Sequence, residues 1–585
     1  MRRAGISSSK TSDSGRQALR PAPCLADAPP YCRPRFAAPI DLKLDGNEGP
    51  PPPAGLLAQL ADGSPDVVRR YPDTSALEAI LAAELNLPPA CVLITAGADD
   101  ALRRACTAVL SPGQEFLLPE PTFAMLPINA RRTGATVVSI PWPEGQFPTD
   151  AVLAQAGPKT AAVAVVSPNN PTGAVARAED LRRLSAELPG ALLMVDLAYG
   201  EYAQEDLRPV ALDLPNAIAV GTLSKAWGLA GLRIGYVAGP EEVISWLQAV
   251  GEPYAVAGPS LLLAQAQLRD GRASMQAHVS RVRRERDALL DLLQELGATA
   301  EASQANFVLA RFTDAAWVRQ ALAGLGIAVR GFSGPEMSNA LRITCPGDED
   351  DFHRLQRALR AVLAPQALLL DLDGVVADVS RSYREAILAT ARQYAVEVNS
   401  DDIGQAKRGG GFNNDWELTR FLICQGGVEV GLEEVKQAFE GLYQGTSRRP
   451  GLRKNESLIP SRTALISMAG RRPLAVVTGR PRSDARRFLE DHSLHDLFAE
   501  VICLEDAVAK PSPEPVLLAL RRLGVTSAWM VGDTVDDIRS ARDAGVVPLG
   551  VISPADDPEA SREALLRAGA ARVVTRLEEI EELWP

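Results

Sequence analysis

Short apolar runs that end in a polar residue recur along most of this chain. In residues 161–167, 191–196 and 217–224 the apolar positions are nearly continuous, and each run closes on a serine or an aspartate. Strands buried on both faces have this pattern, which is typical of a parallel sheet covered by helices. Residues 177–190 and 280–297 instead repeat apolar positions with the helical period and stop at glycine. The pattern predicts an α/β protein.

The alternation of strands and helices starts a second time after residue 366. The Ala-Pro-Gln at 364–366 is interpreted as a brief hinge. Apolar runs of the second series predict strands at 368–372, 474–478, 501–504 and 528–532. A mostly helical insert, at about 380–460, separates the first two. We predict a tail over residues 1–37, one α/β domain over 38–364 and another over 367–585.

Size and charge narrow the class of protein. The chain has 585 residues, too many for one core. Its net charge of −12 argues against nucleic acid or an anionic membrane surface as the main partner. No apolar run is long enough to span a bilayer. Small-molecule ligands, including anions held by a few local arginines, stay open.

Cysteine and histidine usage points to the cytoplasm and away from zinc. The seven cysteines form no CxxC pair, which favours reduced thiols, and none of the four histidines lies beside a nucleophile or a metal cluster. The first 36 residues carry seven Lys/Arg against two Asp, which suits an organellar transit peptide. Because they lack an apolar stretch, a disordered tail is favoured, and organellar import is left open.

The stretch TLSKAWGLAGLRIGY, residues 222–236, contains the most informative lysine. Lys225 follows Thr-x-Ser at the end of an apolar strand, where a lysine can bind a carbonyl cofactor covalently beside phosphate-binding hydroxyls. SPNNPTG at 167–173 and VDLAY at 195–199 precede it, each at a strand end. Ligands of open α/β sheets gather at such ends. TAGADD at 95–100 adds a glycine turn before a helix, whose N-terminus favours an anion.

These motifs, in this order, resemble those of the fold-type I aminotransferases that use pyridoxal phosphate, and look most like those of the histidinol-phosphate aminotransferases, over residues 38–360. The resemblance implies that Lys225 binds the cofactor and moves the substrate proton, and that Asp196 pairs with the pyridine nitrogen. The other implied contacts are Tyr199 and Asn170 at the phenolic oxygen, Phe123 on the ring face, Ala98, Asp99, Ser224 and Arg233 at the phosphate, and Tyr71 at the phosphate of a neighbouring subunit. The last of these implies a homodimer.

Two arginines carry the expectation about the substrate. By the same resemblance, Arg342 in ALRITCP would bind an acidic group, generally a carboxylate, and Arg330 in AVRGF would bind a substrate phosphate. One departure is visible: Asn47-Glu48 is followed by Gly49 and a proline run. A side chain that often lines the substrate pocket is therefore missing. A decarboxylase of a phosphorylated amino acid and an aromatic-amino-acid transaminase stay open.

The second series begins with LLLDLDGVVADVS, residues 368–380. A calcium loop is excluded because Val375 and Val376 occupy the positions that need an oxygen ligand and a glycine. The segments VVTGR (476–480), DAVAKPSPEP (506–515) and MVGDTVDDIRSARDAG (530–545) follow in order. Together the four resemble the motifs of haloacid dehalogenase superfamily phosphatases, over about 367–580.

This resemblance implies a Mg²⁺-dependent phosphatase with a helical cap. Asp371 would attack phosphorus and form an aspartyl-phosphate. Asp373 would protonate the leaving oxygen and then activate water. The remaining implied roles are Thr478 and Lys510 at the phosphoryl oxygens, and Asp371, Asp373, Asp533 and Asp537 at the metal, with Asp536 ranked below Asp537. The segment 408–419 is either a lid or an exposed loop.

The sequence thus predicts a bifunctional enzyme that acts on small molecules. The preferred interpretation is transamination of histidinol phosphate with 2-oxoglutarate, joined to removal of a phosphate from a monoester. Two alternatives stay open for the second domain: a housekeeping phosphatase, for instance on phosphoglycolate, and a non-catalytic sensor of a phosphorylated metabolite.

Overall fold

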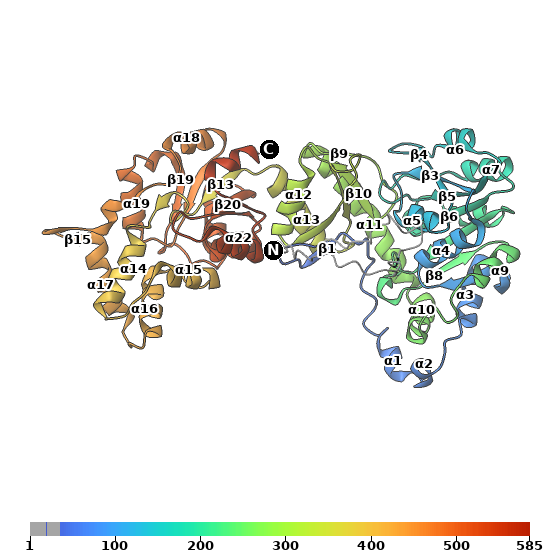
Figure 1. Ribbon diagram of the computed structural model, residues 1–585, viewed down its shortest axis with the longest axis horizontal. Helices are drawn as coiled ribbons and strands as arrows, with labels where there is room; N and C mark the ends of the chain where they lie inside the picture. The colour runs from blue at the N-terminus through green and yellow to red at the C-terminus, as the bar shows by residue number, and fades with distance from the viewer. Residues whose placement is uncertain (1–18, 20–34, 585) are drawn as a thin grey trace, which may run out of the picture.

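The computed structural model describes Leu19 and residues 35–584, so the predicted tail lies almost entirely outside the described residues. Figure 1 shows three bodies in a row: a large sheet domain at right, a smaller lobe in the middle and a second α/β domain at left. The α/β class predicted from the apolar runs is confirmed. No helix in the described part of the chain has the length and apolar character needed to cross a membrane.

The large domain is built on seven strands in the order β2-β8-β7-β6-β5-β3-β4. Their bounds are β2 Val92–Thr95, β3 Glu115–Glu120, β4 Thr136–Pro141, β5 Thr160–Val166, β6 Leu192–Asp196, β7 Ala217–Thr222 and β8 Gly235–Ala238. Only β8 runs antiparallel to its neighbours. β6 and β7 are buried along their whole length, as their unbroken apolar sequences predict. The three runs identified in the sequence became β5, β6 and β7.

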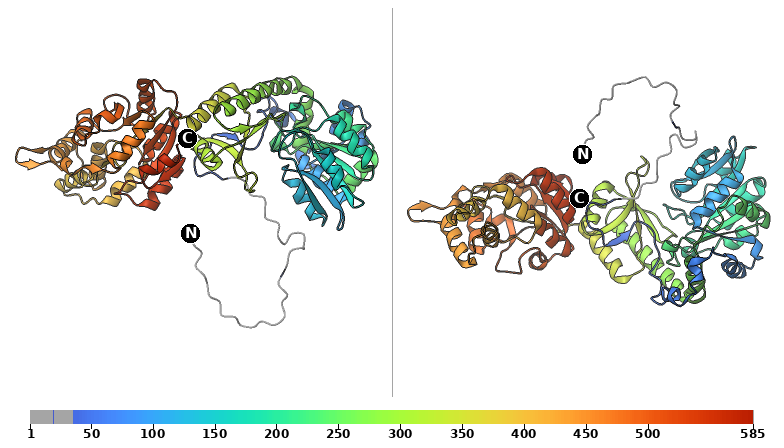
Figure 2. Two further views of the ribbon diagram at one scale, coloured as in Figure 1. Left: turned by 90° about the horizontal axis from the view of Figure 1, so that it is seen from above. Right: turned by 60° about the horizontal axis from the view of Figure 1, so that its bottom comes forward.

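Helices cover both faces of this sheet. Those of the large domain are α1 Ala58–Asp62, α2 Asp66–Arg69, α3 Ser75–Leu85, α4 Ala98–Val109, α5 Met125–Arg132, α6 Thr149–Gln155, α7 Ala178–Glu187, α8 Arg208–Leu212, α9 Glu241–Ala249 and α10 Gly258–Asp270. Helix α11, Arg272–Glu295, is longer than the predicted 280–297 segment at its N-terminal end. It is green in Figure 2, where it runs from the large domain to the small lobe.

The small lobe combines the beginning of the described chain with residues far along the sequence. Its sheet has the order β1-β11-β12-β10-β9, with bounds β1 Leu42–Leu44, β9 Thr299–Ala300, β10 Phe307–Arg311, β11 Ile327–Gly331 and β12 Ala340–Thr344. Helices α12 Ala315–Gly324 and α13 Glu349–Leu363 complete it. Because β1 pairs with β11, residues 45–50 are carried toward the large domain.

The second domain has six parallel strands in the order β19-β18-β13-β20-β21-β22. They are β13 Ala367–Leu370, β18 Leu474–Val477, β19 Phe498–Ile502, β20 Ala528–Gly532, β21 Val547–Val551 and β22 Arg572–Val574, with helices α18 Arg462–Arg471, α19 Arg482–Asp491, α20 Glu514–Leu523, α21 Val535–Asp543 and α22 Pro558–Ala568. β13 lies between β18 and β20, which brings the residues after these three strands to one edge. The insert holds the cap helices α14 Tyr383–Gln393, α15 Ser400–Gly409, α16 Asp415–Gln425 and α17 Leu432–Gln444.

The junction at 364–366 is not the free hinge that the sequence suggests. Gln366 donates its backbone N–H to Ser527 O at 3.0 Å, and its side-chain oxygen accepts from the 526 and 527 amides. Trp529 of β20 is fully buried and donates to Ala361 O of α13 at 2.8 Å. Its ring packs on Trp317 of α12, with 5.0 Å between centroids. The small lobe and the second domain therefore share an apolar interface, and the junction is fixed by both.

Removing the Trp529 side chain tests this shared interface. We expect Trp529→Ala to cost about 3–5 kcal/mol of stability, because a large buried side chain is lost and leaves a cavity. The measurement is the urea midpoint of unfolding followed by circular dichroism. Trp246→Ala, at a site 42% exposed, is the control and should leave the midpoint nearly unchanged. Equal midpoints for the two variants would contradict the interface.

Candidate active sites

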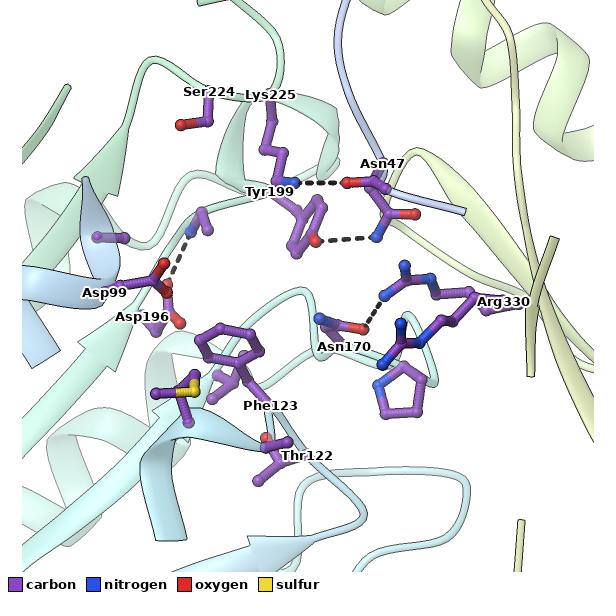
Figure 3. Close-up of a pocket in the computed structure, with 18 of the residues that line it drawn as sticks. Asn47, Asp99, Thr122, Phe123, Asn170, Asp196, Tyr199, Ser224, Lys225 and Arg330 are labelled. Atoms are coloured by element: carbon purple, nitrogen blue, oxygen red, sulfur yellow. Dashed lines mark hydrogen bonds between the residues drawn. The ribbon is translucent and has the colours of Figure 1, made fainter. Parts of the chain in front are cut away.

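A cavity of about 580 Å³ lies where the large domain meets the small lobe (Figure 3). Its floor is formed by residues at the carboxyl ends of parallel strands, as expected for an open α/β sheet. The structure brings together most of the residues predicted for the first site: Ala98, Asp99, Phe123, Asn170, Asp196, Tyr199, Ser224, Lys225, Arg233, Arg330 and Arg342 all line this cavity.

Lys225 projects into the cavity from the turn after β7. Its Nζ donates a hydrogen bond to Gly46 O at 2.9 Å and lies 5.7 Å from the centroid of the Tyr199 ring. The amine is therefore held by the segment that follows β1, on the side of the small lobe. Both lobes contribute to the position of this lysine.

Asp196, the last residue of β6, supplies a buried negative charge. It is 4% exposed, and burial raises the pKa of its carboxyl to about 6, although the Ala198 N–H and the charge of Lys225 oppose the shift. Its Oδ1 accepts the Ala198 N–H at 3.0 Å. A cation bound next to this carboxylate would offset the cost of burying it.

The opposite end of the cavity is suited to an anion. Gly97, with φ of +80°, turns the chain into α4, so the Ala98 and Asp99 amides lie in the first turn of the helix. A Cβ atom on Gly97 would lie 2.6 Å from Arg233 Nη2, so the backbone and this guanidinium approach as closely as glycine allows. Arg233 also pairs with the Asp99 carboxylate at 3.2 Å. The hydroxyl of Ser224 accepts a hydrogen bond from Thr222 at 2.9 Å.

Residues 45–50 contribute contacts that the sequence did not reveal. Asn47 is fully buried with φ of +54°, and its Nδ2 donates to the Tyr199 hydroxyl at 2.9 Å, while its Oδ1 accepts from Thr344 at 2.7 Å. Gly49 packs directly on the turn after β7: a Cβ atom there would lie 1.7 Å from Lys225 O. The departure noted at Gly49 thus has a steric reason, a close approach between two backbones.

Arg342 and Arg330 face the cavity from neighbouring strands. They are directly opposite each other in the pairing of β11 with β12. Arg342 donates to Asn170 Oδ1 at 2.5 Å and to Asp45 O at 2.7 Å. The amide of Asn170, expected at a cofactor oxygen, is therefore oriented by Arg342.

Tyr71 lies outside this cavity, on the molecular surface. It is 80% exposed, and its ring stacks on that of Tyr254, with 4.5 Å between centroids. Val68 and Leu57, in the same stretch of chain, are 77% and 64% exposed. The position of Tyr71 is compatible with the expectation that it serves a neighbouring subunit.

The second site is an acidic cluster at the edge of the second sheet. Carboxylate oxygens of Asp371, Asp533 and Asp537 lie within 4.8 Å of one another. Lys510 Nζ donates to Asp371 Oδ1 at 2.7 Å and also to Asp537 Oδ1. Thr478, which follows β18, is buried beside them, and its hydroxyl accepts the Arg480 N–H at 3.2 Å.

The charges of this cluster suit a bound cation. Burial raises the pKa of Asp371 to about 7; Lys510 opposes the shift, whereas Asp537 and Asp373 add to it. Burial likewise raises the pKa of Asp533 well above its usual value, and Asp533 Oδ1 has no hydrogen-bond partner among the described residues. Three carboxylate oxygens are the hard donors that Mg²⁺ accepts, and the Lys510 ammonium group is a second positive charge beside them rather than a ligand.

Two of the predicted acidic residues, Asp373 and Asp536, have partners outside the acidic cluster. The carboxylate of Asp373, predicted as a metal ligand, lies outside the cluster and pairs with Arg480, because the turn after β13 directs it to the other side. Asp536 accepts the Gly411 N–H at 2.7 Å and so ties the cap to the core. Its lower rank beside Asp537 agrees with this geometry.

The glycine-rich segment of the cap is docked on the core. Besides the Gly411 contact, Asn413 Nδ2 donates to Lys510 O at 3.3 Å, and a Cβ atom on Gly479 would lie 2.7 Å from Asn413 O. Lys407, just before this segment, pairs with Asp415 at 3.2 Å. Burial works to lower the pKa of Lys407, but Asp415, Asp533 and Asp373 raise it. The segment is therefore docked against residues next to the second site, rather than being an exposed loop.

The contact between Gly49 and Lys225 can be tested by substitution. We expect Gly49→Ala to lower stability by about 1–3 kcal/mol, because the new methyl group forces two backbones apart. The measurement is the midpoint of thermal unfolding. Gly55→Ala, whose Cβ would meet nothing within 4 Å, is the matched control. A midpoint for Gly49→Ala equal to that of the control would show that the two backbones do not touch.

Comparison with known proteins matches a family to each of the two α/β regions. The family model of aminotransferase class I and II matches residues 41–359, and that of haloacid dehalogenase-like hydrolase matches residues 365–545. Histidinol-phosphate aminotransferase of Paracoccus denitrificans is 33% identical over 337 residues, which cover 56% of this chain and 90% of that protein.

Two further proteins are similar to this chain, one over a shorter stretch and the other at lower sequence identity. Imidazoleglycerol-phosphate dehydratase of Phytophthora nicotianae is 47% identical over 237 residues, covering 38% of this chain and only about half, 52%, of that protein. The crystal structure of histidinol-phosphate aminotransferase from Sinorhizobium meliloti, in complex with pyridoxal-5'-phosphate, matches with a TM-score of 0.50. At 24% identity, over 55% of this chain and 92% of that one, it shows the fold alone.

The family match spans more than half of the chain and contains every residue of the first cavity, while the acidic cluster lies in the part matched to the hydrolases. The chain is an enzyme that belongs to the class I and II aminotransferases and carries a haloacid dehalogenase-like hydrolase domain.

Proposed function

We propose that this protein is bifunctional: its first site transaminates histidinol phosphate with 2-oxoglutarate, using pyridoxal phosphate, and its second site hydrolyses a phosphomonoester, using Mg²⁺. The observation that carries the first half is one cavity with a lysine amine, a buried carboxylate and an anion-binding helix end. The similarity to histidinol-phosphate aminotransferases supports the substrate.

The residues of the first cavity fit pyridoxal phosphate at both ends. Lys225 would hold it covalently, Asp196 would pair with its ring nitrogen, and Phe123 would lie on the ring face. Its phosphate would take the helix end at Ala98 and Asp99, with Ser224 and Arg233, where the Gly97 turn leaves no room for a side chain. When bound, the ring draws electrons from the substrate carbon.

Lys225 would also move the proton. Its Nζ is positioned from two sides, by the turn after β7 and by Gly46 O, so that the amine has a fixed location at the cavity wall. After its release from the cofactor, this amine can take the proton from the substrate Cα. It can then deliver a proton to the cofactor carbon, which completes the transfer of the amino group. Tyr199, held by Asn47, would donate its hydroxyl hydrogen bond to the ring oxygen.

The two facing arginines explain how one cavity would accept two substrates. Both 2-oxoglutarate and histidinol phosphate carry anionic groups, two carboxylates in the first and one phosphate in the second. Arg330 and Arg342, opposite each other on β11 and β12, present two guanidinium groups that can bind them. Arg342 would bind carboxylate, and Arg330 would bind phosphate.

The acidic cluster supports phosphate hydrolysis in two steps. Asp371 Oδ would form a bond to phosphorus while the ester oxygen leaves with a proton from Asp373; water, deprotonated by Asp373, would then release phosphate from Asp371. Lys510 and Thr478 would bind the phosphoryl oxygens. Asp371, Asp533 and Asp537 would hold Mg²⁺, which offsets the charge of the phosphoryl group.

The two activities would form consecutive steps if the first site works in the direction that makes histidinol phosphate and the second site removes the phosphate of that product. Two relatives of this chain bear names that refer to phosphorylated imidazole compounds, histidinol phosphate and imidazoleglycerol phosphate. Removal of a phosphate from such a product is chemistry that the second site can perform.

The exposed surface around Tyr71 supports assembly into a homodimer. Tyr71, Tyr254, Val68 and Leu57 leave apolar surface in contact with solvent, which is typical of a face that another subunit covers. A second copy of the chain would bring its Tyr71 to the cofactor phosphate of the first.

The proposal is tested by following glutamate and inorganic phosphate in one reaction with histidinol phosphate, 2-oxoglutarate, pyridoxal phosphate and Mg²⁺. We expect Lys225→Ala to lose glutamate formation and keep phosphate release, and Asp371→Asn to do the opposite. Chelation of Mg²⁺ should abolish phosphate release alone. Glutamate without phosphate would direct the second site to another monoester, and neither product from folded, loaded protein would overturn histidinol phosphate as the substrate.

The phosphate role of Arg330 has its own test. We expect Arg330→Met to raise KM for histidinol phosphate about 10- to 100-fold, since a charge-assisted hydrogen bond contributes about 1.5–3 kcal/mol. KM for dephosphorylated histidinol should change little. Arg360→Met, at an arginine paired with Glu295 on the surface of the same lobe, is the control. Equal effects on both substrates would assign Arg330 a role other than phosphate binding.

A further inference from the structure

We propose that Arg480 is a positioning residue that orients the carboxyl group of Asp373 for proton transfer to the leaving oxygen. This inference rests on the phosphatase chemistry proposed for the second site. Arg480 is the last residue of the VVTGR segment. In that segment only Thr478 was predicted to have a role, as a ligand of the phosphoryl oxygens.

Arg480 is buried between two carboxylates. Its side chain is 1% exposed, and its Nε donates to Asp373 Oδ1 at 2.6 Å. Nη2 lies 2.5 Å from the same oxygen, as an ion-pair contact without hydrogen-bond geometry. Nη1 donates to Glu456 Oε2 at 3.0 Å. The guanidinium thus has one acidic partner in the core motif and another in the cap segment.

The guanidinium is fixed in this orientation from all sides. The ring centroids of Tyr383 and Phe488 lie 4.8 Å and 5.2 Å from Arg480 Cζ. Glu456 is itself held, because its Oε1 accepts the Tyr443 hydroxyl hydrogen bond at 3.0 Å. Rotation of Arg480 would break its pair with Glu456 inside the protein, which is costly for buried charges. Arg480 therefore imposes its orientation on Asp373, rather than following it.

The consequence for the reaction comes from which oxygen is bound. Both contacts of Arg480 fall on Asp373 Oδ1, which leaves Oδ2 as the oxygen that would transfer the proton. In the first step the bond between Asp371 Oδ and phosphorus forms, the bond between phosphorus and the ester oxygen breaks, and the proton on Oδ2 passes to that oxygen. In the second step the water oxygen forms a bond to phosphorus, the bond between phosphorus and Asp371 Oδ breaks, and Oδ2 takes the proton that the water loses. A fixed Oδ1 keeps Oδ2 at one location for both transfers.

A purely structural role for Arg480, as a tie between cap and core, makes a different prediction. Loss of a tie would slow hydrolysis of all phosphomonoesters alike. Loss of orientation at Asp373 would slow only those whose leaving oxygen needs a proton. p-Nitrophenolate leaves readily without one, whereas the alkoxide of an alkyl phosphate does not.

The experiment compares kcat/KM for β-glycerophosphate and p-nitrophenyl phosphate in Arg480→Met, since kcat/KM covers the steps up to departure of the leaving group. We expect a loss of about 100-fold on the alkyl ester and of no more than about 3-fold on the aryl ester, given the usual contribution of a general acid. Asp373→Asn should show the same selectivity, and the double variant should lose no more than Asp373→Asn alone. Arg482→Met, at an exposed arginine two residues along, is the matched control.

Further variants separate a failure of the Arg480 role from a failure of the proposed phosphatase chemistry. Should Arg480→Met fail to fold, two other variants replace it. Arg480→Met/Glu456→Gln removes one of the two carboxylates left without a cation, and Arg480→Lys keeps the positive charge but loses the planar guanidinium. Both should lose activity on the alkyl ester selectively. Equal losses on the two esters, in an enzyme that still depends on Asp371, would overturn the role of Arg480 alone. Hydrolysis of neither ester, or hydrolysis that survives Asp371→Asn, would overturn the proposed phosphatase chemistry and this role with it.

Discussion

Compensation of buried charge at the carboxyl ends of parallel strands governs both sites. Lys510 contacts Asp371 and Asp537, so one buried ammonium group offsets part of the charge of two buried carboxylates. Uncompensated, each would cost several kcal/mol. Asp196 is only partly balanced as well: one backbone N–H and the charge of Lys225 oppose the effect of burial, and its pKa is raised to about 6. Each site therefore keeps buried negative charge that a bound cation would offset, a positively charged ring in the first and a metal ion in the second.

Ion pairs at the surface and packed side chains beneath them link the domains. Asp41, at the start of β1, pairs with Arg354 of the small lobe at 2.6 Å and with Arg542 of the second domain at 3.5 Å. β1 leads directly to residues 45–47 in the first cavity, and Arg542 lies in the last turn of α21, the helix whose first turn contains Asp537. With Trp529 buried at the same interface, the chain joins its two catalytic regions through packed elements rather than a free linker.

Local patterns in the sequence were enough to locate the strands, the residues that follow them and hence most of each site. Lys225, Asp196 and Asp371 each stand at the end of an apolar run, so their convergence follows from the parallel sheet. The contacts of Asn47 with Tyr199 and of Gly411 with Asp536 span 152 and 125 residues. No periodicity or motif encodes such contacts, because they depend on how β1 and the cap pack on the core. The fixed junction at 364–366 could not be predicted for the same reason, because its contacts are with residues 526 and 527, far along the chain.

The separation of Asp371 from Asp373 shows how two like residues acquire different environments two positions apart. Gly374 has φ of +77°, and a Cβ atom there would lie 2.0 Å from Asp533 Oδ2, so only glycine allows the chain to turn this close to the acidic cluster. Before the turn, Asp371 stays with Lys510; at the turn, Asp373 is directed to Arg480. A nucleophile must be next to the cations that bind phosphate, and a proton donor must be away from them. The Asp-x-Asp-Gly sequence meets both requirements because the turn at its glycine gives the two carboxylates different partners, Lys510 and Arg480.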